Sequence, residues 1–323
     1  MAVGSKFFKY MASPKGRRFT FYGTTTALLC GFSIKYLPHS LLTDKHREIV
    51  ALYENGIEKK VSQVLENRFI MALNSLKISG SERNYFTPFM VSGFDLYSFG
   101  STKLLNGGFV GIPINFTYTA ADEIPKGEVI LKGYKKIEWN SPGGKLLQEG
   151  LILNEPEQIF GMCKEICECQ TNKVLFNSLY LVAAILFYYG VTSTLNAKHQ
   201  FFSRPLSLRI VLYFLVGIFT TGLYWTLKDG TQIWIDKSID EHLASLGVTF
   251  LAAGVCYYDK VLKKNQAIRA LTDSNEYTAN GNHNHLIRTM TQPLTERKAF
   301  FEERFKKYIA EEKTKADANQ NAN

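Results

Sequence analysis

Three cysteines near the middle of the chain are the side chains whose type and spacing best suit chemistry. In a helix Cys163 and Cys167 would lie one turn apart, and Cys169 follows two residues later. Two thiolates on one side of a helix could hold a copper(I) ion, which soft sulfur ligands favour. The alternative is a set of helix-surface thiols without a ligand, and we expect this alternative. With Cys30 and Cys256 included, the cysteines do not form a disulfide framework.

A second candidate is a pair of histidines in a loop rich in glycine and asparagine. His283 and His285 could bind a metal weakly, but a solvated loop is the structure we expect. The chain has no HExxH zinc motif, no GxxxxGK[ST] phosphate loop, no GxGxxG after a strand and no GxSxG nucleophile elbow. We therefore expect no catalytic residue, no cofactor and no metal, in a protein that is not an enzyme.

The elements that must position any site are dominated by two long stretches without a charged side chain. A helix needs about 20 residues to cross a bilayer. The stretches 174–197 and 210–227 are both close to that length. The connector 198–209 is too short for anything but a turn, and its charged side chains are Lys198, Arg204 and Arg209. The pattern predicts a hairpin of two transmembrane helices with a basic turn. A transporter or channel is the function class we expect least, because charged side chains that would mark an ion path are missing from both stretches.

A third apolar stretch, residues 19–37, is weaker because three threonines and Lys35 interrupt it. The ammonium group of Lys35 could reach the membrane surface, and Pro38 is expected to end the helix. We predict a first transmembrane helix here. The alternative is a targeting segment that is removed from the mature protein.

Much of the excess positive charge lies in the N-terminal arm, residues 1–18, and in the hairpin turn. The net charge of the chain is +9, and no acidic residue precedes Asp44. Positive charge held on the inner side of a membrane explains this pattern better than nucleic-acid binding does. An arm so poor in acids is also typical of a mitochondrial targeting segment.

The region before the hairpin, residues 38–173, has the pattern of a water-soluble domain. Apolar residues at helical spacing predict a helix over 43–76, and further helices are expected from near Lys145 and Glu155. Short β-rich runs broken by glycine and proline predict strands within 107–136. The runs are 109–112 with 114–118, and 129–131.

After the hairpin, residues 228–312 are predicted to form helices that pack on 38–173, followed by a disordered tail, 313–323. The uncharged run 242–258 could be a fourth transmembrane helix, but it is short and rich in small residues, so we expect a buried helix. A basic arm and a basic turn on one side of the membrane would leave both soluble regions on the other. The predicted fold is thus an α+β membrane protein, mostly helical, with three transmembrane helices and a soluble domain that contains a few short strands.

Three segments, in order, resemble the motifs of one known family. Residues 106–113 resemble its GxVVGIP strand, 137–146 its VDWxSPxGxxL turn and helix start, and 253–271 its GGVxFYxKLLxxNxALRxL helix. The family is transmembrane protein 177. The matching residues that we single out as structural or partner-binding are Gly111, Pro113, Trp139, Ser141, Pro142, Gly143, Gly254, Tyr258, Lys260, Asn265 and Arg269.

The resemblance implies a multi-pass protein of the mitochondrial inner membrane that serves the assembly of cytochrome c oxidase, complex IV of the respiratory chain. It implies a chaperone-like role, in which the protein stabilises newly made oxidase subunit 2 and that subunit's membrane chaperone. Copper-delivery factors would be further partners, membrane lipid would surround the spans, and nucleic acid would not be bound. The family pattern does not include the three clustered cysteines, which weakens the copper hypothesis further.

A more distant resemblance concerns HtpX-type membrane zinc metallopeptidases, in which a helix before a transmembrane hairpin carries the HExxH motif. Here residues 164–168 would occupy that helix, with Glu165 as the general base, but Lys164 and Glu168 replace both histidine ligands. The acids near the position of a third ligand are Asp236, Asp240 and Glu241. The alternative function is therefore a membrane-bound metallopeptidase-like hydrolase, or an inactive peptidase homologue that holds a polypeptide client.

Overall fold

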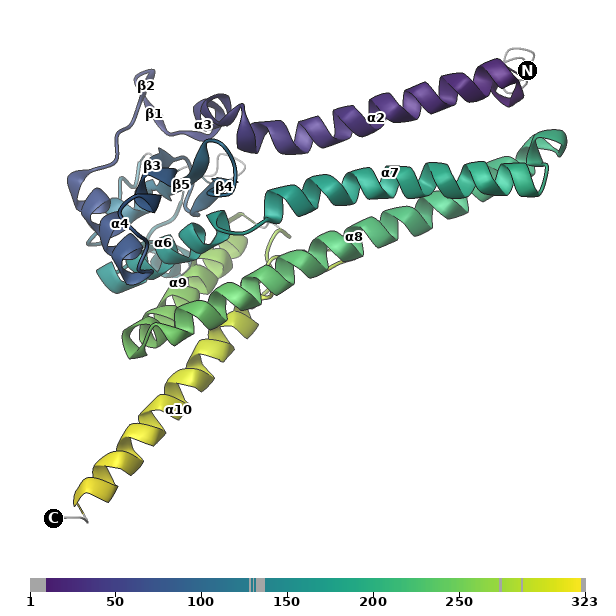
Figure 1. The fold of residues 1–323 in the computed structure, drawn as a ribbon. Coiled ribbons are helices and arrows are strands. Elements are labelled where there is room, and N and C mark those ends of the chain that lie inside the picture. Colours follow the sequence, from purple (N-terminus) through teal and green to yellow (C-terminus); the bar gives the residue numbers. More distant parts are fainter. Residues whose placement is uncertain are drawn as a thin grey trace. The chain divides into compact units, whose positions relative to one another are not determined.

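The computed structural model describes residues 10–127, 129, 131, 137–272, 275–285 and 287–320, and its chain divides into two compact units (Figure 1). One unit combines the chain up to Leu42 with Asn172–Thr231, and the other combines Thr43–Thr171 with the chain from Gln232 onward. The chain is mostly helical, with a few short strands, as the sequence predicts.

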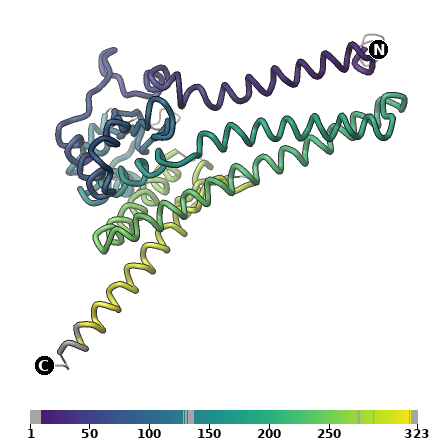
Figure 2. Tube along the Cα trace, in the orientation of Figure 1, coloured from purple at the N-terminus to yellow at the C-terminus, as the bar shows by residue number. Residues whose placement is uncertain are grey.

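The first unit consists of three long helices, traced in Figure 2: α2 (Pro14–Ser40), α7 (Lys173–Lys198) and the first part of α8 (Leu206–Ser245). Helix α2 packs along α7, where a side chain at Gly31 would lie only 3.3 Å from Leu181. Many of the large apolar side chains on these helices are exposed, which is typical of helices surrounded by lipid.

Two helices of the described chain, α7 and α8, are long and apolar enough to cross a membrane. The predicted hairpin is therefore present, with a short 3₁₀ turn, η3 (Phe201–Ser203), between its helices. Helix α2 is not among the helices that qualify, so the predicted count of three spans is not confirmed.

The ends of these helices differ from the prediction in two places. Pro38 does not end α2, because the missing N–H of proline removes one bond while Leu41 and Leu42 still donate to the carbonyl of Leu37 (3.1 and 2.9 Å). Helix α8 does not end near Leu227 either, and runs without a break to Ser245.

The sheet of the second unit has three strands in the order β3, β5, β4 (Phe86–Val91, Gly107–Pro113 and Tyr97–Ser101). Strand β5 runs parallel to β3 and antiparallel to β4, and every residue of β5 is buried. Only β5 matches a predicted strand. The run 114–118 is instead largely a 3₁₀ turn, η2 (Ile114–Thr117), where the Thr117 hydroxyl donates to the Ile114 carbonyl (2.7 Å). In the predicted strand 129–131, Val129 and Leu131 lie outside any strand, and Ile130 is outside the described residues.

The region 43–76, predicted as one helix, is two helices separated by a small hairpin. Helix α3 (Thr43–Val50) is followed by β1 (Tyr53–Glu54), β2 (Ile57–Glu58) and α4 (Gln63–Ser75). Between the two strands Asn55 and Gly56 adopt φ values of 52° and 79°, as a tight hairpin turn requires.

The rest of the second unit is built around helix α9 (Val248–Thr272). Against it pack α5 (Pro142–Leu151), α6 (Glu155–Cys169) and α10 (Leu294–Gln320). A single 3₁₀ turn, η1 (Glu82–Tyr85), precedes β3. Helix α10 continues into the tail that was predicted to be disordered from residue 313, and residues 321–323 lie outside the description.

Candidate functional site

Helix α9 carries five of the family-motif residues, and each of them faces another element. At Gly254 a side chain would lie 2.6 Å from the ring of Phe301 on α10, so only glycine lets the two helices approach this closely. One turn later the hydroxyl of Tyr258 donates to Asp240 on α8 (2.9 Å). These two motif residues therefore fix α9 against α10 and α8.

Tyr258 belongs to a buried polar cluster, the Arg297 cluster, which comprises Arg297, Asp236, Asp240 and Tyr258. The guanidinium of Arg297 binds both oxygens of Asp240 (2.6 and 2.7 Å) and lies 3.5 Å from Asp236. The central carbon atom of the Arg297 guanidinium is 5.0 Å from the centre of the Tyr258 ring. Asp236 also accepts hydrogen bonds from the Gln232 side chain and from the backbone N–H of Gln292 (3.0 and 3.1 Å). The cluster joins α8, α9 and α10 inside the protein.

The electrostatics of the Arg297 cluster favour fixed protonation states. Burial raises the pKa of the Tyr258 hydroxyl well above its usual value, so this group stays a hydrogen-bond donor. For Arg297, burial alone would lower the pKa, but Tyr258 and the carboxylate of Asp240 raise it above its usual value. A carboxylate that accepts from a guanidinium and a tyrosine is poorly placed to take a proton from a substrate.

The other α9 motif residues contact two further parts of the unit, α6 and the loop after α9. Lys260 donates to the buried carboxylate of Glu157 on α6 (2.6 Å). The Asn265 side chain donates to the carbonyl of Gly281 (2.8 Å), and Arg269 donates to the carbonyl of Tyr277. These bonds attach the loop after α9 to the helix.

The motif turn before α5 caps that helix and brings it to α9. Ser141 is the N-cap, and its hydroxyl accepts from the N–H of Gly144 (3.0 Å) while Pro142 occupies the first turn. Gly143 faces α9, because a side chain there would lie 3.3 Å from Leu271. Trp139 donates from its indole N–H to the carbonyl of Lys126 (3.1 Å), which closes the preceding loop.

The strand motif lies apart from these contacts. Gly111 is buried in β5, where a side chain would approach Phe89 and Val91 to 3.0 and 3.1 Å, and Pro113 ends the strand. The structure thus brings the turn motif and the α9 motif together and leaves the strand motif in the sheet. The peptidase comparison placed Asp236 and Asp240 near a third ligand, but their contacts with Arg297 and Tyr258 were not predicted, although the two acids lie one helical turn apart in the sequence.

The three clustered cysteines are buried thiols of the core, so the expectation of helix-surface thiols is wrong. Cys163 is completely buried and donates weakly to the carbonyl of Ala72 (3.5 Å), while Cys169 lies near the carbonyls of Phe99 and Phe109. Burial raises the pKa of Cys163 and raises that of Cys167 to about 12. Thiols that keep their protons do not favour copper(I), which binds thiolates.

The loop that carries the histidine pair reaches the surface, with His283 exposed and His285 half-buried. The His283 ring lies 5.1 Å from that of Tyr277 and 6.0 Å from that of His285. Burial lowers the pKa of His283 below its usual value of 6.5, with Asp95 acting in the opposite sense. Among the described residues no group of three or more His, Cys, Asp or Glu side chains is placed to hold a metal.

Glu165, at the position of a general base in the peptidase comparison, lies on α6 beside the outer strand β4. It accepts a hydrogen bond from Ser98 of that strand (2.5 Å) and forms an ion pair with Lys164. Burial alone would lower the pKa of Lys164, but Glu165 raises it above its usual value. Asp236 and Asp240 bind instead within the Arg297 cluster and to its neighbours Gln232 and Gln292.

Comparison with known proteins returns relatives that share one name. The chain is 27% identical over 222 residues to transmembrane protein 177 of Xenopus laevis, which covers 66% of this chain and 71% of that protein. It is 26% identical over 258 residues to transmembrane protein 177 of Danio rerio (77% and 81%) and 25% identical over 218 residues to that of Homo sapiens (66% and 70%). No family model and no solved structure matches the chain. The resemblance to the transmembrane protein 177 family is confirmed, because the chain is similar to proteins of that name over 66–77% of its length.

Proposed function

We propose that the protein is a non-enzymatic assembly factor of the mitochondrial inner membrane, which stabilises newly made cytochrome c oxidase subunit 2 together with that subunit's membrane chaperone. The observation that carries the proposal is the similarity to transmembrane protein 177 along 66–77% of the chain. The N-terminal arm is basic and has no acidic residue, which supports targeting to mitochondria. Copper-delivery factors are proposed as further partners.

The exposed side of the hairpin offers a surface for a client's transmembrane helix. On α7 the exposed residues Ala183, Leu186, Phe187 and Gly190 follow one another at helical spacing. Gly190 has open space where a side chain would be, whereas a side chain at Gly217 would meet Tyr188 at 3.7 Å, inside the hairpin. Small residues on an exposed helix face let a second helix approach closely in lipid. Ala183 and Gly190 therefore suit a client contact, and Gly217 suits packing within the hairpin.

Purification of the full chain from gently solubilised mitochondria, with mass spectrometry of the bound proteins, tests the proposal. We expect oxidase subunit 2 and its chaperone to be enriched with the wild-type chain. Gly190→Leu should reduce this enrichment without affecting folding, because the new side chain enters open space. Gly80→Leu, in an equally open position of the second unit, is the control. Failure of both wild type and control to enrich subunit 2 would contradict the proposal.

The alternative function, an inactive peptidase homologue or a metallopeptidase-like hydrolase, is supported by one arrangement. Helix α6 presents Glu165 to the outer strand β4 ahead of the hairpin, as the comparison with HtpX-type enzymes requires. Zinc retained by the purified protein, together with peptide hydrolysis that is lost in Glu165→Gln, would favour the hydrolase. Neither signal would be expected of an assembly factor.

A further inference from the structure

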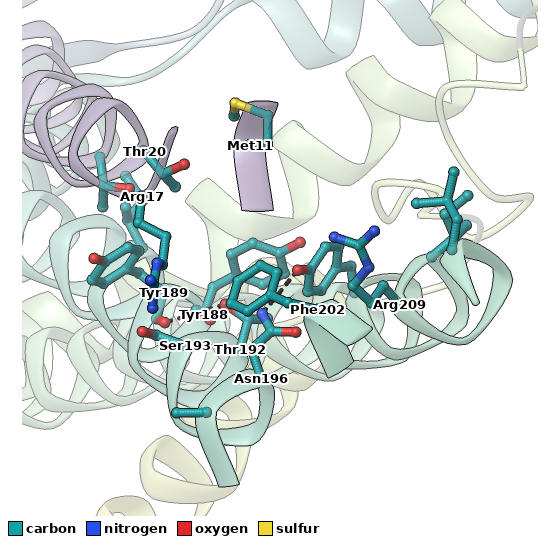
Figure 3. Close-up of a pocket in the computed structure, with 16 residues that line it drawn as sticks. Met11, Arg17, Thr20, Tyr188, Tyr189, Thr192, Ser193, Asn196, Phe202 and Arg209 are labelled. Carbon is teal, nitrogen blue, oxygen red and sulfur yellow. Dashed lines mark hydrogen bonds between the residues drawn. The ribbon is translucent and has the colours of Figure 1, made fainter. Parts of the chain in front are cut away.

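A cavity of about 530 Å³ lies within the first unit, among α2, α7 and the start of α8 (Figure 3). Helix α2 contributes Arg17, α7 contributes Tyr188 and Asn196, and the start of α8 contributes Arg209. The cavity therefore opens at the basic-turn end of the predicted transmembrane hairpin.

Two of its polar side chains are buried with an unmatched atom. Arg209 is only 8% exposed, and within the described chain its Nε has no hydrogen-bond partner. Asn196 is 5% exposed; its amide N–H donates to the Tyr213 hydroxyl (2.8 Å), but its carbonyl oxygen has no partner among the described residues. A buried donor of a charged group is unfavourable without an acceptor, so the Nε atom of Arg209 favours an anionic ligand in the cavity. The carbonyl oxygen of Asn196 favours a ligand that also carries a hydrogen-bond donor.

A second arginine reinforces the positive charge of the cavity. The guanidinium carbon atoms of Arg17 and Arg209 lie 5.8 and 5.7 Å from the centre of the same aromatic ring, that of Phe202. Two guanidinium groups from two different helices thus lie near one ring, and the turn between α7 and α8 adds cations but no acid. Guanidinium groups bind phosphate oxygens in a bidentate manner, which makes a phosphate the best-matched anion.

The remaining lining distinguishes a lipid from a small inorganic ion. Apolar side chains of Ile185, Leu206 and Ile210 also line the cavity, and they would gain nothing from an inorganic ion. Glycerol and acyl groups would cover them. The carbonyl oxygen of Asn196 needs a hydrogen-bond donor, and a hydroxyl of a glycerol headgroup supplies one.

We propose that this cavity binds an anionic phospholipid that carries hydroxyl groups on its head, with the phosphate between Arg209 and Arg17 and a headgroup hydroxyl on Asn196. Basic pockets between membrane helices bind such headgroups by the same chemistry. The site is independent of any client of the hairpin. It would tie α2 to α7 and α8 through a lipid.

Native mass spectrometry of the full chain, purified with phosphatidylcholine and then exposed to phosphatidylglycerol, tests the site. We expect phosphatidylglycerol to be retained at least about tenfold better than phosphatidylcholine, as a charge-assisted bond to a buried arginine implies. Arg209→Gln should abolish most of this preference, and Arg209→Lys should keep part of it. Arg204→Gln is the matched control, because Arg204 lies in the same turn, 5.6 Å from the Phe201 ring, and does not line the cavity.

Two further measurements distinguish lipid binding from misfolding of the variant and from binding of free phosphate. Arg17 is exposed, so Arg17→Gln should leave the chain folded and still weaken phosphatidylglycerol binding severalfold. Inorganic phosphate at millimolar concentration should not displace the lipid, whereas displacement would identify free phosphate as the ligand and overturn the lipid assignment. Equal retention of the two lipids by the wild type, or an equal loss in Arg204→Gln and Arg209→Gln, would also overturn it.

Discussion

At the scale of single residues, the second unit depends on charges that are buried and matched. The Arg297 cluster places one guanidinium between two carboxylates of α8, and all three side chains are at most 6% exposed. The acids at positions 236 and 240 are visible in the sequence at helical spacing, but their partner lies 57 residues beyond Asp240. Such a pairing depends on the tertiary fold, so a single sequence does not predict it.

Removal of the guanidinium should be strongly destabilising. We expect Arg297→Ala to lower the free energy of unfolding by about 3–5 kcal/mol, because it leaves two buried carboxylates without their cation. Lys298→Ala is the control, since its partner Asp259 lies at the surface and an exposed pair contributes about 1 kcal/mol or less. Chemical unfolding in detergent measures both. Equal losses in the two variants would show that the cluster is not structural.

The His283 ring is exposed but lies close to the rings of Tyr277 and His285, and its lowered pKa predicts a small pH dependence of stability. Because burial lowers its pKa in the folded state, the native ring stays neutral where the unfolded chain would already bind a proton. The stabilisation is present above the usual value of 6.5 and is lost as pH falls below it toward the folded pKa. The side chains whose charges act on the ring are Asp95, Lys264, Glu276 and His285.

Unfolding measured between pH 7.5 and pH 5 should therefore show a loss of stability that His283→Gln reduces. His242→Gln is the control, because His242 lies on α8, outside the loop that carries His283. A wild-type slope that His283→Gln leaves unchanged would contradict this assignment.

The cysteines show the limits of prediction from residue types. Helical spacing placed Cys163 and Cys167 on one side of a helix, and they do lie on α6. The spacing does not say whether that side faces solvent or core, and here it faces α4 and the sheet. Burial, rather than spacing, decides that these thiols keep their protons.

At the scale of elements, glycines set how closely the helices of the second unit approach. On α5 a side chain at Gly150 would lie 2.6 Å from the backbone nitrogen of Lys264 on α9, and at Gly254 it would meet the Phe301 ring. Backbone atoms cannot move aside as a flexible side chain can. The α5–α9 contact is thus more sensitive to an added methyl group than most helix contacts are.

Gly150→Ala should accordingly destabilise the protein by about 1–3 kcal/mol through overpacking. The same substitution at Gly230 of α8, where the space is open, should be neutral or stabilising by up to about 1 kcal/mol, since alanine favours helix. Thermal unfolding of the two variants in detergent compares them. A stabilising effect of Gly150→Ala would show that α5 and α9 do not approach this closely.

The elements that were predicted correctly are those with a strong local pattern. The apolar stretches became α7 and α8, and Ser141–Pro142 capped α5. The prediction of one helix over 43–76 failed because its periodicity was read across Asn55–Gly56, a pair that favours a tight hairpin. Strands β3 and β4 were missed because they are short and become stable only beside β5.

At the scale of the whole molecule, a hairpin of two spans constrains the topology. The chain segments before α7 and after α8 must lie on the same side of the membrane, whether or not α2 also crosses it. Thr43–Thr171, before α7, and the chain from Gln232 onward also form one compact unit. Two parts of one folded unit must lie in the same compartment, and a hairpin of two spans also places them there.

If the protein lies in the mitochondrial inner membrane, as we propose, protease added to the outer face of that membrane should cut the regions 43–171 and 246–320 together or spare them together. Epitope tags in each region report the cleavage, and a matrix protein that stays intact is the control. Cleavage of one region with protection of the other would exclude the hairpin as a membrane anchor.

The most direct test of the account is pulse labelling of mitochondrial translation products in cells that lack this protein. If the hairpin holds a newly inserted subunit, labelled oxidase subunit 2 should be made at a normal rate and then decay faster than in wild-type cells, while other mitochondrial products persist. The wild-type chain should restore its lifetime, and Gly190→Leu should do so less well. An unchanged lifetime of labelled subunit 2 in the absence of the protein would contradict the proposed function.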